Sequence, residues 1–180
     1  PFDFMTYQDH VQKTNSFIEN NLVKYRFSNE EVGFCRAIHD ERIANRHIVD
    51  SAHPSKFVIS GKISRHHTDE ELYFGLLCEL MVAREYGKLI SEKNIYKEWA
   101  NDQIRQNKKV LSEGKFDSKD IGNCQVRTSQ YSSFQKRNII YRENDFRTKA
   151  YQPLIGCIIN TNPSDMWAVI CGFISYEDLI

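Results

Sequence analysis

The residues with the clearest chemical potential are two acids and a polar pair that follow one another along the chain. Glu79 is the one acid within residues 72–83, LYFGLLCELMVA, where most side chains are apolar. Asp120 precedes the run CQVRT, in which Gln125 and Arg127 point to the same side of an extended strand. Carboxylate and amide oxygens are ligands for hard divalent cations, so this set indicates a metal site.

Glu79 has two interpretations. A helix that is apolar on nearly all sides is usually buried, and an unpaired carboxylate there costs several kcal/mol or more. Glu79 therefore either belongs to a structural ion pair or faces an active site and helps to hold a cation. For the ion pair, the candidate partners in the preceding helix are Arg36, Arg42 and Arg46.

This arrangement resembles the PD-(D/E)xK nuclease superfamily, which has the restriction-endonuclease-like fold. The segments GLLCELMVAREYG and KDIGNCQVRT carry the resemblance, which covers about residues 68–175. A helical Glu often precedes the signature in that superfamily, and Glu79 takes its place here. Asp120 takes the place of the motif Asp, and Gln125 and Arg127 take the places of the (D/E)xK pair.

The resemblance implies hydrolysis of phosphodiester bonds in nucleic acid, with DNA as the expected substrate and Mg²⁺ or Mn²⁺ as the cofactor. The implied metal ligands are the side chains of Glu79, Asp120 and Gln125 and the backbone carbonyl of Val126. Arg127 is implied to lie beside the attacking water and the phosphate. All four side chains are therefore expected to contribute to catalysis.

The chain departs from the superfamily pattern at three positions. Gln125 replaces the usual acid; its amide oxygen still coordinates Mg²⁺ but gives up one negative charge. Arg127 replaces the usual lysine; it stays protonated, so it can stabilise charge on the phosphate but cannot act as a general base. Lys119 replaces the usual proline, and Asp117 is an alternative for the role of Asp120. Because of these departures, an alternative function remains: a non-catalytic nuclease-fold protein that binds nucleic acid or a protein partner.

A basic segment follows the signature. Residues 127–149 hold six basic and two acidic side chains, with aromatic residues interleaved, a composition that suits a phosphate backbone and stacked bases. A solvated sheet edge protected by positive charge is an equal alternative. The residues expected to bind nucleic acid are Lys136, Arg137, Arg142, Arg147 and Lys149.

The composition is that of a globular protein without an overall charge. Basic and acidic residues number 24 each, so any nucleic-acid binding must come from local patches. We expect no membrane span, because no run of 18 apolar residues occurs, and no signal peptide at the start of the chain. Five scattered cysteines without a CxxC motif indicate reduced thiols and a cytoplasmic location. A homodimer is left open.

The elements that must position these residues are helices followed by a sheet. Capping boxes at Ser28 and Thr68 predict helix starts, and Gly87 predicts a helix stop. We expect helices over 5–23, 29–50 and 69–86, a helix or loop over 91–112, and a short strand within 53–61.

The second half of the chain predicts strands at NCQVRTS, RNIIYRE, PLIGCIIN and MWAVICGFIS, the last two paired as an antiparallel hairpin. The fold class is therefore α+β, with N-terminal helices followed by a mixed or antiparallel sheet. We expect one domain over 1–180, consisting of a helical region at 1–67 and a nuclease-like core at 68–180.

Overall fold

The computed structural model of the chain describes residues 7–45, 58–59, 62–63, 69–89, 94–113, 120–122, 124–131 and 153–175. These residues form four helices and a mixed four-stranded sheet, which confirms the predicted α+β class. The helices are α1 (Tyr7–Asn21), α2 (Asn29–Ala44), α4 (Asp69–Leu89) and α5 (Ile95–Glu113). The strands of the sheet are β1 (Tyr25–Arg26), β4 (Gln125–Gln130), β5 (Leu154–Asn160) and β6 (Trp167–Ile174).

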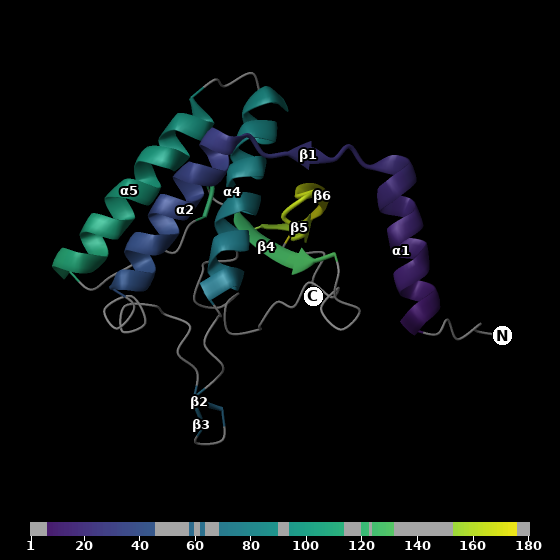
Figure 1. Cartoon of the computed structure of the whole chain (residues 1–180), viewed down its shortest axis with the longest axis horizontal. Coiled ribbons are helices and arrows are strands. Elements are labelled where there is room, and N and C mark those ends of the chain that lie inside the picture. Colours follow the sequence, from purple (N-terminus) through teal and green to yellow (C-terminus); the bar gives the residue numbers. More distant parts are fainter. Residues whose placement is uncertain are drawn as a thin grey trace.

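The sheet has the order β1-β6-β5-β4 (Figure 1). The predicted hairpin of β5 and β6 is confirmed, since these strands pair antiparallel. β4 pairs parallel with β5, and β1 pairs antiparallel with β6. Two further strands, β2 (Val58–Ile59) and β3 (Lys62–Ile63), form a separate antiparallel pair where a short strand was expected.

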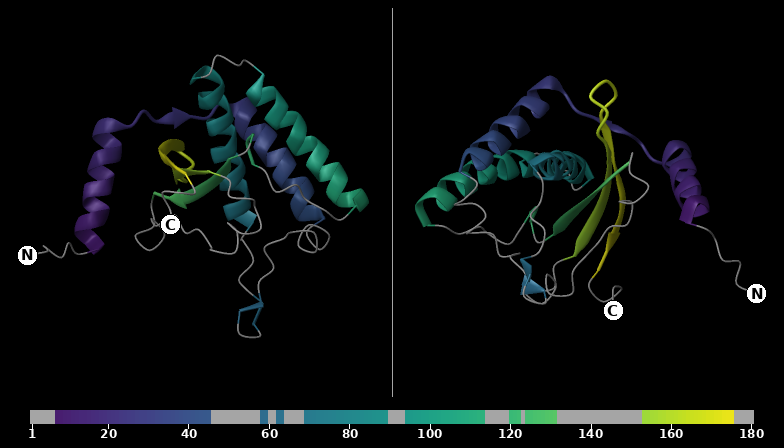
Figure 2. Two further views of the ribbon diagram at one scale, coloured as in Figure 1. Left: turned by 180° about the vertical axis from the view of Figure 1, so that it is seen from behind. Right: turned by 60° about the horizontal axis from the view of Figure 1, so that its bottom comes forward.

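Helices cover both faces of the sheet. α2, α4 and α5 lie together on one side and α1 lies on the other (Figure 2). The larger core is formed by α2, α4 and α5 with the facing side chains of β4, β5 and β6. On the opposite face, Ile18 of α1 packs with Ile158, Trp167 and Val169. The restriction-endonuclease-like core remains an expectation from the resemblance.

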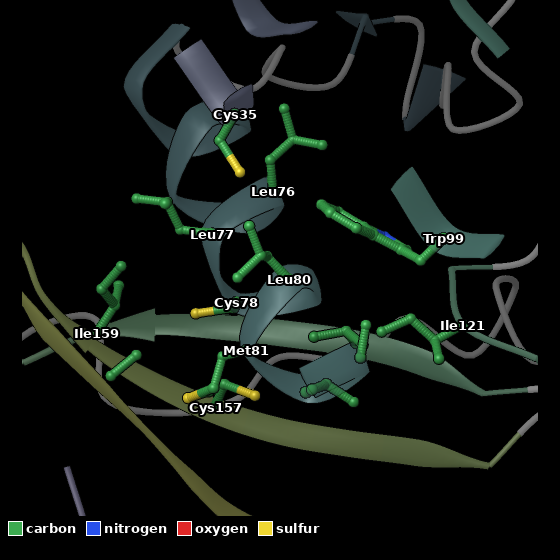
Figure 3. Packing of buried hydrophobic residues seen from close by; sticks show 14 of the residues in the cluster. Cys35, Leu76, Leu77, Cys78, Leu80, Met81, Trp99, Ile121, Cys157 and Ile159 are labelled. Atoms are coloured by element: carbon green, nitrogen blue, oxygen red, sulfur yellow. The ribbon is translucent and has the colours of Figure 1, made fainter. Parts of the chain in front are cut away.

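α4 is the central helix of the larger core. Its predicted burial is confirmed: Leu77 and Leu80 are fully excluded from solvent, and Leu76 and Met81 are nearly so. These side chains lie between the neighbouring helices and the sheet, where Cys157 of β5 meets them (Figure 3). Helix α4 thus places Glu79, which is partly buried, at the edge of this core.

Three sequence predictions about element boundaries are wrong. α2 ends at Ala44 rather than at residue 50, because Asn45 caps it: its backbone N–H bonds to Arg42 O at 3.2 Å and its side chain bonds to Glu41 O at 2.9 Å. α4 continues through Gly87 instead of stopping there. The sheet does not wholly follow the helices, since β1 precedes α2 and is too short to show a pattern.

Other boundaries agree closely. α1 begins and ends two residues inside its predicted range, and the segment at 91–112 is helical as α5. The capping box of Ser28 and Glu31 is present. The predicted strand RNIIYRE and the predicted cap Thr68 lie outside the described residues. Among the helices that the structure describes, none combines the length and the apolar character that crossing a membrane requires.

Glu31 connects three elements near the start of α2. Its carboxylate accepts hydrogen bonds from the Tyr25 hydroxyl at 2.6 Å, the Ser28 backbone N–H at 2.9 Å and Arg84 Nε at 3.2 Å. Arg84 in turn stacks over the Tyr96 ring, 3.4 Å from its centroid. Because Glu31 is buried, this network joins β1 and α2 to α4 and α5.

We expect Glu31→Ala to lower the free energy of unfolding by about 2 kcal/mol, because the donors of Tyr25, Ser28 and Arg84 lose one shared, buried acceptor. Glu30→Ala is the matched control: Glu30 is exposed in the same helical turn and should change stability by less than about 0.5 kcal/mol. Urea unfolding measures both variants. Equal losses would contradict the role assigned to Glu31.

Candidate functional site

A tight turn folds Asp120 against the start of β4. Ile121 and Cys124 bridge this turn with two backbone hydrogen bonds of 3.2 and 2.8 Å. Gly122 has φ 56°, a left-handed conformation that glycine adopts at low cost. The Asp120 carboxylate then accepts a hydrogen bond from the Val126 backbone N–H at 2.9 Å. The acid predicted from the signature is therefore anchored to the strand that carries the polar pair.

Glu79 and Asp120 lie close enough to interact electrostatically; we call these two residues the acid pair. Burial of the Glu79 carboxyl, and next the negative charge of Asp120, raise the pKa of Glu79 well above its ordinary value. Two groups act in the opposite direction. Arg42 does so by its charge, and Trp99 Nε1 donates a hydrogen bond of 3.4 Å to Glu79 Oε1.

The register of β4 decides which way its side chains point. Val126 lies beside Ile155 of β5, and both belong to the core under α4. Ser129 lies beside Ile158, which belongs to the core under α1. Since side chains alternate along a strand, the even-numbered residues of β4 face α4 and the odd-numbered residues face α1.

Gln125 and Arg127 thus leave the strand together, as predicted, but on the face opposite Glu79. Gln125 is fully buried, whereas Arg127 is partly exposed. The Arg127 guanidinium turns back toward its own backbone, where Nη1 lies 3.4 Å from the Val126 carbonyl oxygen. A side-chain role for Gln125 beside the acid pair stays a prediction.

The Val126 peptide connects the acid pair with the polar pair. The Gln125 N–H bonds to Pro153 O at 2.8 Å, toward β5. Backbone groups alternate in direction along a strand, so the N–H and C=O of Val126 point to the other edge of β4. Asp120 meets the N–H there and Arg127 meets the C=O. A carboxylate, a carbonyl oxygen and a guanidinium thus gather at one strand edge.

The acid pair supplies two carboxylates. Among the described residues, no group of three or more His, Cys, Asp and Glu side chains is placed to hold a metal ion. A divalent cation would therefore take Glu79 and Asp120 together with a backbone or amide oxygen. The alternative acid Asp117 lies outside the described residues.

All five residues predicted to bind nucleic acid also lie outside the described residues: Lys136, Arg137, Arg142, Arg147 and Lys149. Tyr131, an aromatic residue of the same segment, packs against Trp167 with ring centroids 4.9 Å apart, and its hydroxyl lies 3.4 Å from Glu19 Oε1. It therefore contributes to the packing of α1 on the sheet.

The buried amide side chains of α5 that lie near the acid pair were not predicted from the sequence. Arg42 was one of three candidate partners for Glu79, but no prediction covered the α5 side chains that hold Arg42 in place. The signal was present: the buried positions of α5 follow a helical period and include three amide side chains. These buried residues are Trp99, Gln103, Gln106, Asn107 and Val110.

In comparisons with known proteins, no family model, no curated protein and no solved structure matches this chain. The inference about the acid pair therefore rests on the interactions of Glu79 and Asp120 in this structure. Asp120 is bonded to the edge of β4, and its charge acts on the acid of the central helix.

Glu79 should make the stability of the metal-free protein depend on pH. Its pKa is raised in the folded state, so the folded protein keeps this proton to a higher pH than the unfolded chain does. The free energy of unfolding therefore falls as pH rises from the ordinary value of 4.5 through the folded-state pKa. Glu79→Gln stays neutral and removes this fall.

Urea unfolding in EDTA measures this effect. Glu79→Gln should be more stable than wild type at pH 8, and the difference should shrink at pH 4. Glu70→Gln, at an exposed position of α4, is the control and should show no such trend. A stability difference between Glu79→Gln and wild type that is the same at both pH values contradicts the raised pKa of Glu79.

Proposed function

We propose that this protein is a metal-dependent nuclease that hydrolyses phosphodiester bonds, with Mg²⁺ or Mn²⁺ as cofactor and DNA as substrate. The observation that carries the proposal is that Asp120, anchored at the start of β4, acts electrostatically on the carboxyl of Glu79. The resemblance to the PD-(D/E)xK superfamily puts one acid on a helix and one before the signature strand. The described structure has both acids, in that order and in one place.

The acid pair fits a hard divalent cation by its chemistry. Two neighbouring carboxylates repel each other when both are ionised, and a cation between them removes that repulsion. Oxygen ligands from carboxylates and backbone carbonyls are those that Mg²⁺ and Mn²⁺ prefer. Glu79, Asp120 and the carbonyl oxygen of Val126 are the proposed ligands. When bound, the metal would polarise the phosphate and lower the pKa of a coordinated water.

The residues of the chain have separate tasks in this proposal. Asp120 is held by the Val126 N–H, so one of its oxygens is fixed and the carboxylate keeps its orientation. Arg127 supplies a permanent positive charge and hydrogen-bond donors toward the phosphate, but it takes no proton from water. Gln125 replaces a third anion with a neutral amide, which weakens the affinity for the cation.

A second function is favoured by one observation. Arg42 already brings a positive charge to the acid pair from within the protein. With that charge in place the pair is partly neutralised without a metal. The alternative is a non-catalytic nuclease-fold protein that binds nucleic acid or a protein partner. The two functions differ in whether the acid pair binds a divalent cation.

Asp120→Asn should retain the fold and nucleic-acid binding and lose metal-dependent cleavage by at least about a hundredfold. The amide oxygen of Asn still accepts the Val126 N–H, so the turn is preserved while the charge is lost. Asp40→Asn makes the same chemical change at an exposed position and should cleave like wild type. The assay is cleavage of plasmid and single-stranded DNA in Mg²⁺, Mn²⁺ and EDTA.

Two results would argue against a nuclease. If wild type cuts neither substrate in either metal, the binding function leads. If wild type and Asp120→Asn cut equally, the activity comes from another site or from a contaminating enzyme. Binding of labelled DNA by each variant, measured in EDTA, separates loss of binding from loss of cleavage.

Gln125→Glu tests whether the signature strand reaches the metal. A carboxylate at this fully buried position should lower the melting temperature in EDTA, because burying a charge without a partner is unfavourable. Mn²⁺ should then raise the melting temperature by more than it does in wild type, and cleavage should be kept or increased. Gln106→Glu, also buried but on α5, is the control and should gain nothing from Mn²⁺.

A Mn²⁺-induced shift that is no larger in Gln125→Glu than in wild type would exclude Gln125 from the metal site. Differential scanning fluorimetry over a Mn²⁺ titration gives these shifts for all three proteins. Cleavage rates at saturating Mn²⁺ then show whether the restored charge also helps the reaction.

A further inference from the structure

Arg42 is held in a fixed position by two amide side chains of α5. Its Nε donates to Asn107 Oδ1 at 2.6 Å, and one terminal nitrogen donates to Gln103 Oε1 at 2.8 Å. Both amides are buried, with 4% and 5% of their surface exposed. The Asn107 amide nitrogen is fixed in turn, since it donates to Ile38 O at 3.3 Å and to Glu41 Oε2 at 2.7 Å.

This clamp orients a cation without neutralising it. Gln103 and Asn107 carry no charge, so the hydrogen bonds that they accept leave the positive charge of Arg42 available to act on nearby acids. Gln103 lies one helical turn from Trp99 on α5, and Trp99 donates to Glu79, so the clamp holds the guanidinium about one turn of α5 from that carboxyl. The acids whose charges act on Arg42 are Glu79, Glu41, Asp102 and Asp120. The Arg42 guanidinium thus carries a permanent positive charge in a defined position. It is held there by α5, a helix that contributes neither Glu79 nor Asp120.

We propose that Arg42 is a positioning residue: an internal counter-ion that Gln103 and Asn107 clamp beside the acid pair, and that competes with a divalent cation for it. Without metal, its charge offsets the repulsion between the two acids and favours their ionised forms. With metal, the same charge repels the incoming cation and weakens binding. The competition rests on the proposed function, whereas the counter-ion role does not.

A double-mutant cycle in EDTA tests the counter-ion role without any metal. Arg42→Met leaves the acid pair without its internal cation and should lower the melting temperature by on the order of 10 °C. In a Glu79→Gln background the same change should cost less than half as much, because only one acid remains. Additive losses would overturn the counter-ion role.

Loss of folding in Arg42→Met would not end the test. Adding Glu79→Gln to Arg42→Met should then restore a folded protein, because removing one acid removes the need for the cation. A combined variant that also fails to fold would overturn the proposal. Arg36→Met is the matched control: Arg36 lies on the same helix, over the Tyr73 ring at 3.7 Å, and its loss should be additive with Glu79→Gln.

Titration of free Mn²⁺ by electron paramagnetic resonance tests the competition. Arg42→Met should bind Mn²⁺ about tenfold more tightly than wild type, because a like charge near the site is removed. Arg42→Lys keeps a charge but loses the forked clamp, and should bind much as wild type does. A merely structural role predicts weaker binding in both variants, and that result would overturn the competition.

The outcomes separate this inference from the proposed nuclease function. Non-additive melting temperatures with tighter Mn²⁺ binding in Arg42→Met support both. Non-additive melting temperatures without Mn²⁺ binding in either protein overturn the nuclease and the competition together. Mn²⁺ binding of equal strength in wild type and Arg42→Met leaves the nuclease standing and overturns the competition.

Discussion

The burial of α4 is the constraint on which the rest of the structure depends. This helix packs against two other helices and against the sheet, so almost every position along its middle turns is interior. Glu79 is partly buried among those positions, so its carboxylate is less hydrated than it would be on a surface. Trp99, Arg42 and Asp120 are placed around it by three different elements. Their arrangement places one hydrogen-bond donor, one positive charge and one negative charge around a partly buried carboxyl.

Two electrostatic contributions act on Glu79, an unfavourable one from Asp120 and a favourable one from Arg42. Asp120 anchors its turn by accepting the Val126 N–H, and it also brings a second negative charge toward Glu79. Arg42 brings a positive charge, which makes the arrangement tolerable before any ligand arrives. Electrostatic repulsion of this kind is common at sites where a protein binds a ligand of opposite charge. In the proposed function, the balance between the two contributions sets how tightly a cation would bind.

Local patterns in the sequence predicted much of this fold, and contacts between distant segments account for the rest. The apolar run around Glu79 predicted a buried helix, and the alternation at Gln125 and Arg127 predicted a strand with a shared polar face. No local pattern predicts which face of β4 packs against α4, because the choice of face depends on the parallel register between β4 and β5. The clamp on Arg42 joins residues 65 and 61 positions apart in the chain, beyond the reach of any periodicity.

The thiols have a practical consequence for studying this molecule. Cys35, Cys78 and Cys157 come from α2, α4 and β5, and all three are fully excluded from solvent and free. Burial raises the pKa of Cys35, and contact with Cys78 together with burial raises that of Cys157, so few thiolates are present to react. Alkylating reagents can reach these sulfurs only when the layers separate. The unmodified chain thus carries built-in reporters, on two helices and one strand of the larger core, for the rate at which that core opens.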